Sequence, residues 1–511
     1  MITLIKRLSS PEIRAPLTAL FAGAITPLSL APFNVWIAGL LSLALFFHVI
    51  RGLDTRPGLL IAFLFGLGYY GSGASWVFIS IHEFGHTPLP LALLMTGLFV
   101  AAMALIFSLP WSLARLIPIP KHESKNGELF FAPLIFAALW LTGEWLRSWL
   151  FTGFPWLYVG YAHLDTALAG WAPIGGVFAL GFVLAFSAAA ISQFIAQMVR
   201  KTQRFMVWGP LVCALGFWLG GSALQQHDWT HKKGPSISVG MVQPNIPQEL
   251  KWAPHFRQPT LDRLTSLSET LWQHDWVIWP EASVPLLYHE AQDFLLETDR
   301  RAQAENSSLI TGILYDDYSQ RKYFNSVLGL GKASGLYHKQ RLVPFGEYVP
   351  LENWLRGLIE FFDLPHSTIY PGPSEQQGLL AGNVRIAPSI CYEVVYPGLV
   401  AAAAANADVL LTISNDAWFG GSIGPLQHMQ MAQMRALESG RYMIRSTNNG
   451  VSGIIDERGR ITAISKQFEL QTLSGEVYAM AGLTPFLKWG SAPWVIMSLL
   501  LLAIAGYRAR T

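Results

Sequence analysis

Long apolar runs without charged side chains constrain this chain more than any other feature. Residues 15–50 contain no Asp, Glu, Lys or Arg, and residues 57–227 contain only 12 in 171 positions, about 7%. Residues 228–476 contain 46 in 249 positions, about 18%. Because a bilayer excludes charge and each helical crossing needs about 20 apolar residues, the first half of the chain is predicted to be a helical membrane region.

Breaks between the apolar runs predict about eight spans. Two short helices lie within residues 15–50, separated by residues 31–34, and the others cover 57–82, 84–114, 129–151, 166–199, 205–227 and 489–507. Glu144 and Arg147 fall inside the fifth span, where their spacing allows them to pair on one helix face. The predicted domains are therefore a membrane domain at 1–227, a water-soluble domain at 228–480, and a closing span with its tail at 481–511.

Loop charges predict how these spans are oriented. Lys and Arg gather in alternate loops, whereas loops 31–34, 80–88 and 152–164 contain none. Positive loops stay on the cytoplasmic side, so both termini are expected there and the soluble domain outside, in the periplasm of a bacterium. The basic start resembles a signal peptide, but because more spans follow it is expected to be an uncleaved anchor. A net charge of only +2 excludes a nucleic-acid binder that works by bulk charge.

The soluble domain alternates between short β-branched runs and amphipathic stretches, which is typical of a layered α/β domain. The predicted strands are 236–243, 275–279, 309–314, 325–330, 384–390, 408–413, 442–446 and 451–455. The predicted helices are 256–273, 289–304, 395–406 and 426–440.

Two short patterns resemble catalytic motifs without their context. His82–His86 (HEFGH) matches a zinc-protease helix motif, but Gly85 and Pro88 disfavour a helix, so a polar turn is expected. Gly420–Gly424 (GGSIG) matches a nucleophile elbow, but the only later His is His428, and no acidic residue separates it from Ser422. A flexible loop is the better interpretation there, and the sequence predicts no metal site and no cofactor.

Three segments place reactive groups at predicted strand ends. Glu281 follows the strand DWVIW, Lys339 lies in YHKQRLVPFGEY, and Cys391 ends the strand before CYE. Such a cysteine supplies a nucleophile, a glutamate accepts its proton, and a lysine stabilises the resulting negative charge. The second cysteine, Cys213, lies in a predicted span, so no disulfide is expected.

These segments resemble the Glu–Lys–Cys triad of the nitrilase superfamily, and the whole chain resembles the apolipoprotein N-acyltransferase family. Further matching stretches are 243–248 (QPNIPQ), 342–350 (LVPFGEYVP), 414–420 (SNDAWFG) and 445–450 (RSTNNG). The resemblance implies a polytopic helical membrane domain joined to a nitrilase-like α-β-β-α sandwich.

The resemblance also implies a role for each matching residue. Glu281 matches the general base, Lys339 the triad lysine, and Cys391 the nucleophile. Three residues match supporting positions beside the triad: Glu347, Tyr392 and Glu393. Three more match positions on arms and loops near the mouth of the site: Trp252, Asn325 and Trp418.

The implied reaction transfers an acyl chain from a membrane phospholipid, through a Cys391 thioester, to the α-amine of a diacylglyceryl-apolipoprotein. The implied location is the bacterial inner membrane, with a monomeric enzyme that uses no metal, cofactor or nucleic acid. The alternative is a membrane-anchored amidohydrolase, in which water discharges the thioester; a scaffold or transporter is a third class. Residues 354–365 (WLRGLIEFFDLP) are expected to form an amphipathic lid or arm at the membrane surface.

Overall fold

The computed structural model describes residues 11–117, 119–120, 126–200, 208–344, 346–348 and 369–510. The chain forms two compact units. The first comprises Met1–His82, Thr87–Asp228 and Trp489–Thr511, and the second comprises Glu83–His86 and Trp229–Lys488. The predicted lid at 354–365 lies outside the described residues.

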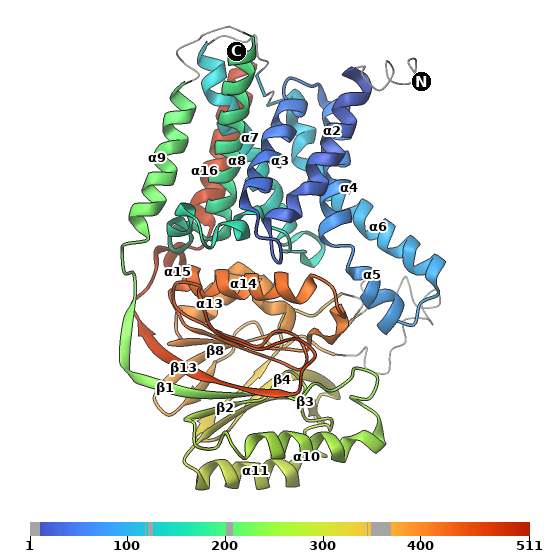
Figure 1. The fold of residues 1–511 in the computed structure, drawn as a ribbon, viewed down its shortest axis with the longest axis vertical. Helices are drawn as coiled ribbons and strands as arrows, with labels where there is room; N and C mark the ends of the chain where they lie inside the picture. The colour runs from blue at the N-terminus through green and yellow to red at the C-terminus, as the bar shows by residue number, and fades with distance from the viewer. Residues whose placement is uncertain are drawn as a thin grey trace. The chain divides into compact units, whose positions relative to one another are not determined.

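The first unit is helical (Figure 1). Its helices are α2 (Pro11–Ile25), α3 (Trp36–Ile50), α4 (Thr55–Gly73), α5 (Val77–Ile79), α6 (Leu89–Ser108), α7 (Asn126–Arg147), α8 (Ala172–Val199), α9 (Trp208–Leu224) and α16 (Ala492–Arg508). Glycines allow two of these helices to pack backbone to backbone. A Cβ on Gly68 would lie 2.1 Å from the carbonyl oxygen of Leu20, so α2 and α4 approach more closely than larger residues permit.

Helix lengths in the first unit support fewer membrane crossings than the uncharged runs of the sequence do. Within the residues that the structure describes, three helical stretches are long and apolar enough to cross a bilayer: Leu89–Leu113, Leu129–Arg147 and Ala167–Val199. A fourth is a pair bent by 62°, Thr55–Gly73 with Val77–Phe84. Three further apolar helices are shorter: Trp36–Ile50, Trp208–Leu224 and Ala492–Arg508. The eight-span count is therefore not confirmed, because turns shorten several uncharged runs into helices below bilayer length.

Burial distinguishes an inner helix from an outer one in this unit. The Ala167–Val199 stretch is 89% buried inside the protein, whereas the equally apolar Leu89–Leu113 stretch is only 22% buried. Exposing an apolar helix of this length to water is unfavourable, whereas contact with the hydrocarbon of a bilayer is not. The first unit is thus a membrane-embedded bundle by its surface as well as by its composition.

Glu144 and Arg147 do not pair with each other as the sequence suggested. The Glu144 carboxylate accepts the N–H of Val159 at 3.1 Å. Arg147 donates to the carbonyl oxygens of Phe154, at 3.1 Å, and Trp156. Both side chains therefore satisfy the irregular backbone that follows α7, because in a membrane unpaired peptide groups are costly.

The second unit contains two sheets packed face to face between helices (Figure 1). The first sheet has the order β13 (Gln471–Ala481), β1 (His231–Gln243), β2 (Trp276–Ile278), β3 (Ser308–Asp317), β4 (Lys322–Gly331) and β6 (Leu336–His338). The second has the order β12 (Ile461–Ile464), β11 (Gly453–Ile455), β10 (Met443–Thr447), β9 (Val409–Ser414), β8 (Val384–Ile390), β7 (Leu379–Ala381) and β5 (Ala333–Ser334).

Apolar side chains of both sheets form the central core, where Met241 and Ile278 of the first sheet meet Ile390 and Leu411 of the second. Helices α10 (Arg257–Ser268) and α11 (Gln292–Ala304) cover the outer face of the first sheet through a second cluster that includes Leu264. Helices α13 (Pro397–Ala404) and α14 (Gly424–Ser439) cover the second sheet (Figure 1). The layers are the predicted α-β-β-α sandwich.

Parallel pairing at the centre of each sheet determines where the functional side chains gather. Strands β1, β2 and β3 run parallel, and so do β8, β9 and β10. Loops that leave the carboxyl ends of parallel strands emerge at one edge, which is where α/β proteins place their sites. Glu281 follows β2, Cys391 follows β8 and Asn415 follows β9.

All eight predicted strands and all four predicted helices of this unit have counterparts in the structure, with ends shifted by a few residues. The sequence analysis missed five short or late strands: β5, β6, β7, β12 and β13. Among them, β13 pairs antiparallel with β1 from Gln243↔Gln471 to His231↔Ala481 and extends the first sheet at its edge. Its half-exposed residues do not alternate strictly, which is why hydropathy alone did not indicate it.

Candidate active site

The segment that carries Glu281 is fixed to β3 by backbone hydrogen bonds. Trp279 N–H donates to Ile310 at 2.9 Å, and Ser283 N–H donates to Gly312 at 3.1 Å. A Cβ on Gly312 would lie 2.5 Å from the backbone nitrogen of Ala282, so glycine is required for this close approach. The carboxylate after β2 is thereby anchored on rigid sheet.

Glu281 is buried, and both of its oxygens accept hydrogen bonds. Oε1 accepts from Asn325 Nδ2 at 2.7 Å and lies 3.5 Å from Lys339 Nζ. Oε2 accepts the backbone N–H of Asn415 at 2.6 Å. Three donors thus contact the carboxylate, and hydrogen bonds to an ionised acceptor are the strong ones. Lys251 Nζ donates to the backbone carbonyl oxygen of Glu281 at 3.1 Å.

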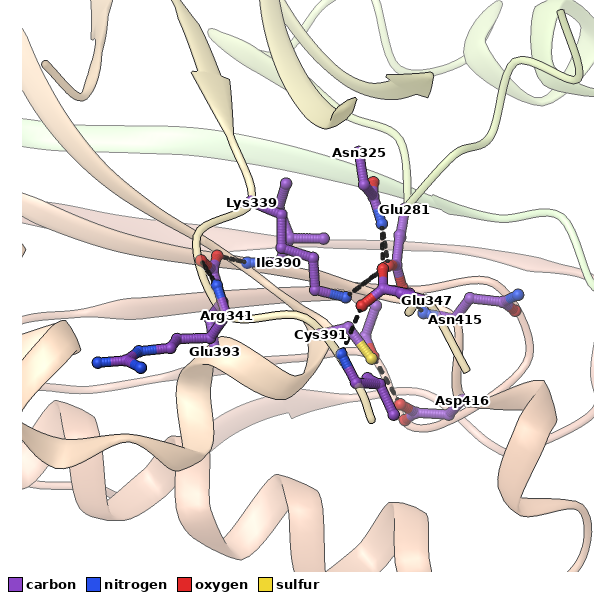
Figure 2. Close-up of polar contacts among 12 residues, drawn as sticks. Glu281, Asn325, Lys339, Arg341, Glu347, Ile390, Cys391, Glu393, Asn415 and Asp416 are labelled. Carbon is purple, nitrogen blue, oxygen red and sulfur yellow. Dashed lines mark hydrogen bonds and ion pairs between the residues drawn. The ribbon is translucent and has the colours of Figure 1, made fainter. Parts of the chain in front are cut away.

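Lys339 lies between two carboxylates and is only 1% exposed (Figure 2). Its Nζ donates to Glu347 Oε1 at 2.8 Å, and Asn325 Nδ2 donates to the same oxygen at 3.1 Å. Burial opposes the charge on Lys339, but Glu347 and Glu281 outweigh burial and raise the pKa of this ammonium. Lys339 is therefore a permanent cation, and Glu347 holds it in place.

Cys391 begins the 3-10 helix Cys391–Val395 directly after β8, with a φ of +51° that L-residues seldom adopt. Burial and then the Glu281 charge raise the pKa of its thiol to about 12, although Lys339 lowers it. The resting group is therefore a thiol rather than a thiolate, and it needs a base before it can attack. Figure 2 shows its sulfur below the Lys339 and glutamate side chains.

Glu393 connects the loop after β8, which carries Cys391, to the loop after β6, which carries Lys339 (Figure 2). It is fully buried, and its Oε2 accepts the N–H of Ile390 at 2.7 Å. Its Oε1 accepts three donors: Gln340 N–H at 2.6 Å, Arg341 N–H at 3.2 Å and Tyr337 O–H at 3.0 Å. Burial raises the pKa of Glu393 to about 7, although these hydrogen bonds lower it.

The three residues predicted near the mouth of the site occupy different positions. Asn325 lies in strand β4 and is 5% exposed, so it is part of the site interior rather than of an arm or loop. Trp252 lies half-buried in a turn, and Trp418 lies half-buried in the short helix Asp416–Phe419. Tyr392, beside Cys391, is buried with its ring 5.3 Å from that of Tyr396.

Sequence reasoning missed several polar residues of this site. Lys251 is buried, and burial lowers the pKa of its ammonium to about 8 although Glu281 and Cys391 raise it. Asn415, Asp416 and His428 also lie in this region. These residues lie in or near the stretches that match the family, and this was the only sequence feature that could have indicated them. Their spacing along the chain does not show that such distant segments meet.

The two decoy motifs have local structural roles. The helical turn Ser80–Phe84 ends before His86, which has a φ of +49°, so the two histidines of the HEFGH pattern do not share a helix face. Ser422 accepts the N–H of Gly424 at 3.1 Å, at the start of α14. Neither segment supplies the geometry its motif requires.

A thiol, a carboxylate with strong donors and a buried permanent cation meet at one edge of the sandwich. This set is suited to attack on an acyl carbonyl: the carboxylate can take the thiol proton, and the cation can stabilise developing oxyanion charge.

Comparisons with known proteins agree with this geometry. Residues 22–190 match the model described as "Apolipoprotein N-acyltransferase N-terminal domain", and residues 238–485 match "Carbon-nitrogen hydrolase". The apolipoprotein N-acyltransferase of Azotobacter vinelandii is 47% identical over 97% of this chain and 95% of its own length. That of Pseudomonas aeruginosa is 47% identical over 98% of both chains, and that of Vibrio cholerae is 40% identical over 98% of both. The chain belongs to the apolipoprotein N-acyltransferase family.

Proposed function

We propose that this chain N-acylates lipoproteins: it takes an acyl chain from a membrane phospholipid and passes it to the α-amine of a diacylglyceryl-modified N-terminal cysteine. The observation that carries the proposal is the convergence of Glu281, Lys339 and Cys391 in a carbon-nitrogen hydrolase domain joined to a membrane-embedded bundle. Relatives of this architecture carry the N-acyltransferase name over nearly their whole length.

The first half-reaction forms a thioester on Cys391. Glu281 takes the thiol proton as the sulfur attacks the ester carbonyl of the phospholipid. Lys339 faces the oxyanion of the tetrahedral intermediate and stabilises its charge. The carbon–oxygen bond then breaks, Glu281 returns the proton to the departing alkoxide, and lysophospholipid leaves.

The second half-reaction releases the acyl chain to the lipoprotein. The unprotonated α-amine attacks the thioester carbonyl, and the carbon–sulfur bond breaks. Glu281 takes a proton from the amine nitrogen and returns one to the Cys391 sulfur, which restores the thiol. The scheme is therefore ping-pong, with Glu281 acting as base and acid in turn.

The membrane unit gives a physical reason for this substrate pair. Each CH₂ group contributes about 0.8 kcal/mol to partitioning into the bilayer, so lifting a whole acyl chain into water is prohibitive. A site that acts on two lipids is therefore expected to work at the membrane surface. We propose the bacterial inner membrane, with the catalytic domain periplasmic, both termini cytoplasmic and the enzyme monomeric; the alternating basic loops support the orientation.

Intact mass of the full-length protein, incubated with phospholipid vesicles, tests the proposal. We expect a mass increase of one acyl chain that neutral hydroxylamine removes and that Cys391→Ala lacks. A diacylglyceryl-peptide with a free N-terminus should then discharge the adduct and gain the acyl chain. Rapid discharge by water without the peptide would favour the amidohydrolase instead, and absence of any adduct or released fatty acid would refute acyl transfer.

A further inference from the structure

Four buried polar side chains that the proposed mechanism does not use surround Cys391. They are Ser414 at the end of β9, Asp416 in the next turn, His428 on α14 and Arg445 on β10, and each is at most 1% exposed. Burying such groups is costly unless they are fully hydrogen-bonded, so their presence beside a nucleophile requires a reason.

The four side chains form a chain of contacts that begins and ends on Cys391. Ser414 lies beside the Cys391 thiol and lowers its pKa, and the Ser414 hydroxyl donates to Asp416 Oδ1 at 2.6 Å. Asp416 Oδ2 accepts Arg445 at 2.6 Å, and the same guanidinium nitrogen lies 3.0 Å from His428 Nδ1. His428 Nε2 lies 3.1 Å from the carbonyl oxygen of Cys391.

Hydrogen-bond chemistry determines the direction of each contact. A carbonyl oxygen only accepts, so His428 Nε2 must carry hydrogen. His428 Nδ1 lies 3.0 Å from Arg445 Nη2 and 3.2 Å from Asp416 Oδ1; because a guanidinium only donates, Nδ1 accepts from Arg445, which bridges the imidazole to the carboxylate. His428 is thus neutral, and burial and Arg445 lower its pKa accordingly. Burial opposes the Asp416 charge, but the Arg445 charge outweighs burial and holds the pKa of Asp416 well below its usual range.

The same logic applies to the thiol. Ser414 has one hydroxyl hydrogen, and because the Asp416 carboxylate only accepts, that hydrogen points to Asp416. Asp416 therefore orients the Ser414 hydroxyl, which lies beside the Cys391 sulfur. Asp416 itself is packed against Gly450, where a Cβ would lie 2.3 Å from Oδ2, so the carboxylate has little freedom to turn.

Cys391 needs this support because its backbone conformation is unfavourable. A φ of +51° costs an L-residue free energy and persists only where surrounding contacts impose it. Contacts at both the carbonyl oxygen and the thiol restrain the two ends of the residue, so the backbone and the side-chain torsion are fixed together. A nucleophile displaced by about 1 Å can lose about 100-fold in rate.

We propose that Ser414, Asp416, His428 and Arg445 form a positioning ring that orients Cys391 for attack and sets the rate of thioester formation. None of the four exchanges a proton with substrate in this scheme; they act through Cys391. The inference rests on the thioester mechanism proposed above.

The test compares His428→Leu with His428→Gln in the full-length protein in phospholipid vesicles. The Gln amide can donate to the Cys391 carbonyl as Nε2–H does, whereas Leu fills a similar volume without donating. Thioester formation is followed by intact mass to give a rate, a final amplitude and the phospholipid dependence. Met434→Leu, at a fully buried position of the same helix, controls for altered packing of α14.

We expect His428→Leu to lower the rate of thioester formation by about 10- to 100-fold at wild-type amplitude and with an unchanged half-saturating phospholipid concentration. His428→Gln should recover most of the loss, and Met434→Leu should behave as wild type. A merely structural role would lower the amplitude and the thermal stability instead, and Gln would not rescue it; that pattern, or a wild-type rate in His428→Leu, would overturn the proposal.

Two further arms keep the outcomes separate. If the wild type itself forms no thioester, the proposed function fails rather than the ring. If His428→Leu does not fold, Ser414→Ala decides, because it leaves Asp416, Arg445 and His428 in contact and removes only the hydroxyl that holds the thiol. We expect it to slow thioester formation by about tenfold at full amplitude, and an unchanged rate would refute the ring.

Discussion

Replacing Glu393 by Gln keeps the side-chain shape but removes the charge that joins the nucleophile loop to the lysine loop. The best orientation of the amide leaves its oxygen on Gln340, Arg341 and Tyr337 and turns its NH₂ group toward the Ile390 N–H. The hydrogen bond from the Ile390 N–H is replaced by a contact between two donors. The other three hydrogen bonds remain but lose their charged acceptor. The unsatisfied buried donor and the weakened bonds together cost about 2–4 kcal/mol.

We expect this cost to lower the rate of thioester formation rather than the free energy of unfolding. Burial raises the pKa of Glu393 from 4.5 to about 7, so its ionised form is disfavoured in the folded protein by about 3 kcal/mol, which a neutral Gln avoids. The two effects nearly cancel in the free energy of unfolding. However, Ile390 precedes Cys391, so its displacement should slow thioester formation by about 30- to 1,000-fold.

The raised pKa of Glu393 predicts the direction in which the free energy of unfolding changes with pH. Because the folded-state pKa of Glu393 lies above the unfolded value, the folded protein holds this proton more tightly between about pH 4.5 and 7. The unfolding free energy of the wild type, relative to Glu393→Gln, should therefore be highest below pH 4.5 and should fall by about 3 kcal/mol as the pH rises to 7 and above.

Intact mass measures the rate of thioester formation in phospholipid vesicles. Thermal unfolding of the detergent-solubilised variants at several pH values measures their stability. Glu476→Gln, an exposed position on β13, is the matched control and should change neither. A Glu393→Gln variant that forms the thioester at more than a third of the wild-type rate would refute the role assigned to these four hydrogen bonds.

Three further predictions follow from the geometry of the site. Glu281→Gln should lower the pKa of the Cys391 thiol, because burial and then the Glu281 charge raise it. Iodoacetamide should therefore alkylate the variant several-fold faster at pH 8, and slower alkylation would contradict this. Thioester formation should fall at least about 100-fold, because the base is lost. Gly312→Ala should slow thioester formation, because its Cβ would displace the segment that carries Glu281. Gly398→Ala is the control and should leave the rate unchanged, because its Cβ would meet no atom within 4 Å. Equal rates in the two variants would show that the Glu281 segment is not displaced. Asn325→Asp should abolish most thioester formation, since a third carboxylate would lie about 3 Å from the other two; intact mass would detect the loss, and a near-wild-type rate would show that the amide is dispensable.

The positions of Glu281 and Cys391, two members of the proposed triad, followed from local patterns of the sequence. Each of Glu281 and Cys391 directly follows a short apolar run, and a run of this kind is a strand whose carboxyl end opens onto a loop. The apolar segments of the first unit were equally readable, because absence of charge over 20 residues is a local property. Family resemblance then added the roles of these residues, which local pattern alone does not supply.

Other features depended on contacts between distant parts of the chain. Asn325 was expected near the mouth, but pairing of β4 with β3 and β6 places it between the two carboxylates. Glu144 and Arg147 have a spacing that suits an ion pair, but the unpaired backbone after α7 competes successfully for both. Uncharged runs likewise overstated helix length, because turns end several helices before they reach bilayer thickness.

The sequence by itself determined the division into an apolar helical part and a charged α/β part, and it placed a carboxylate, an ammonium and a thiol at loop positions. These properties depend on the residue and its near neighbours. Only the tertiary structure decided that Glu393 joins two loops and that Ser414, Asp416, Arg445 and His428 close on Cys391. Hydrogen bonds are directional and short in range, so which distant groups meet at 3 Å depends on how two sheets and their helices pack.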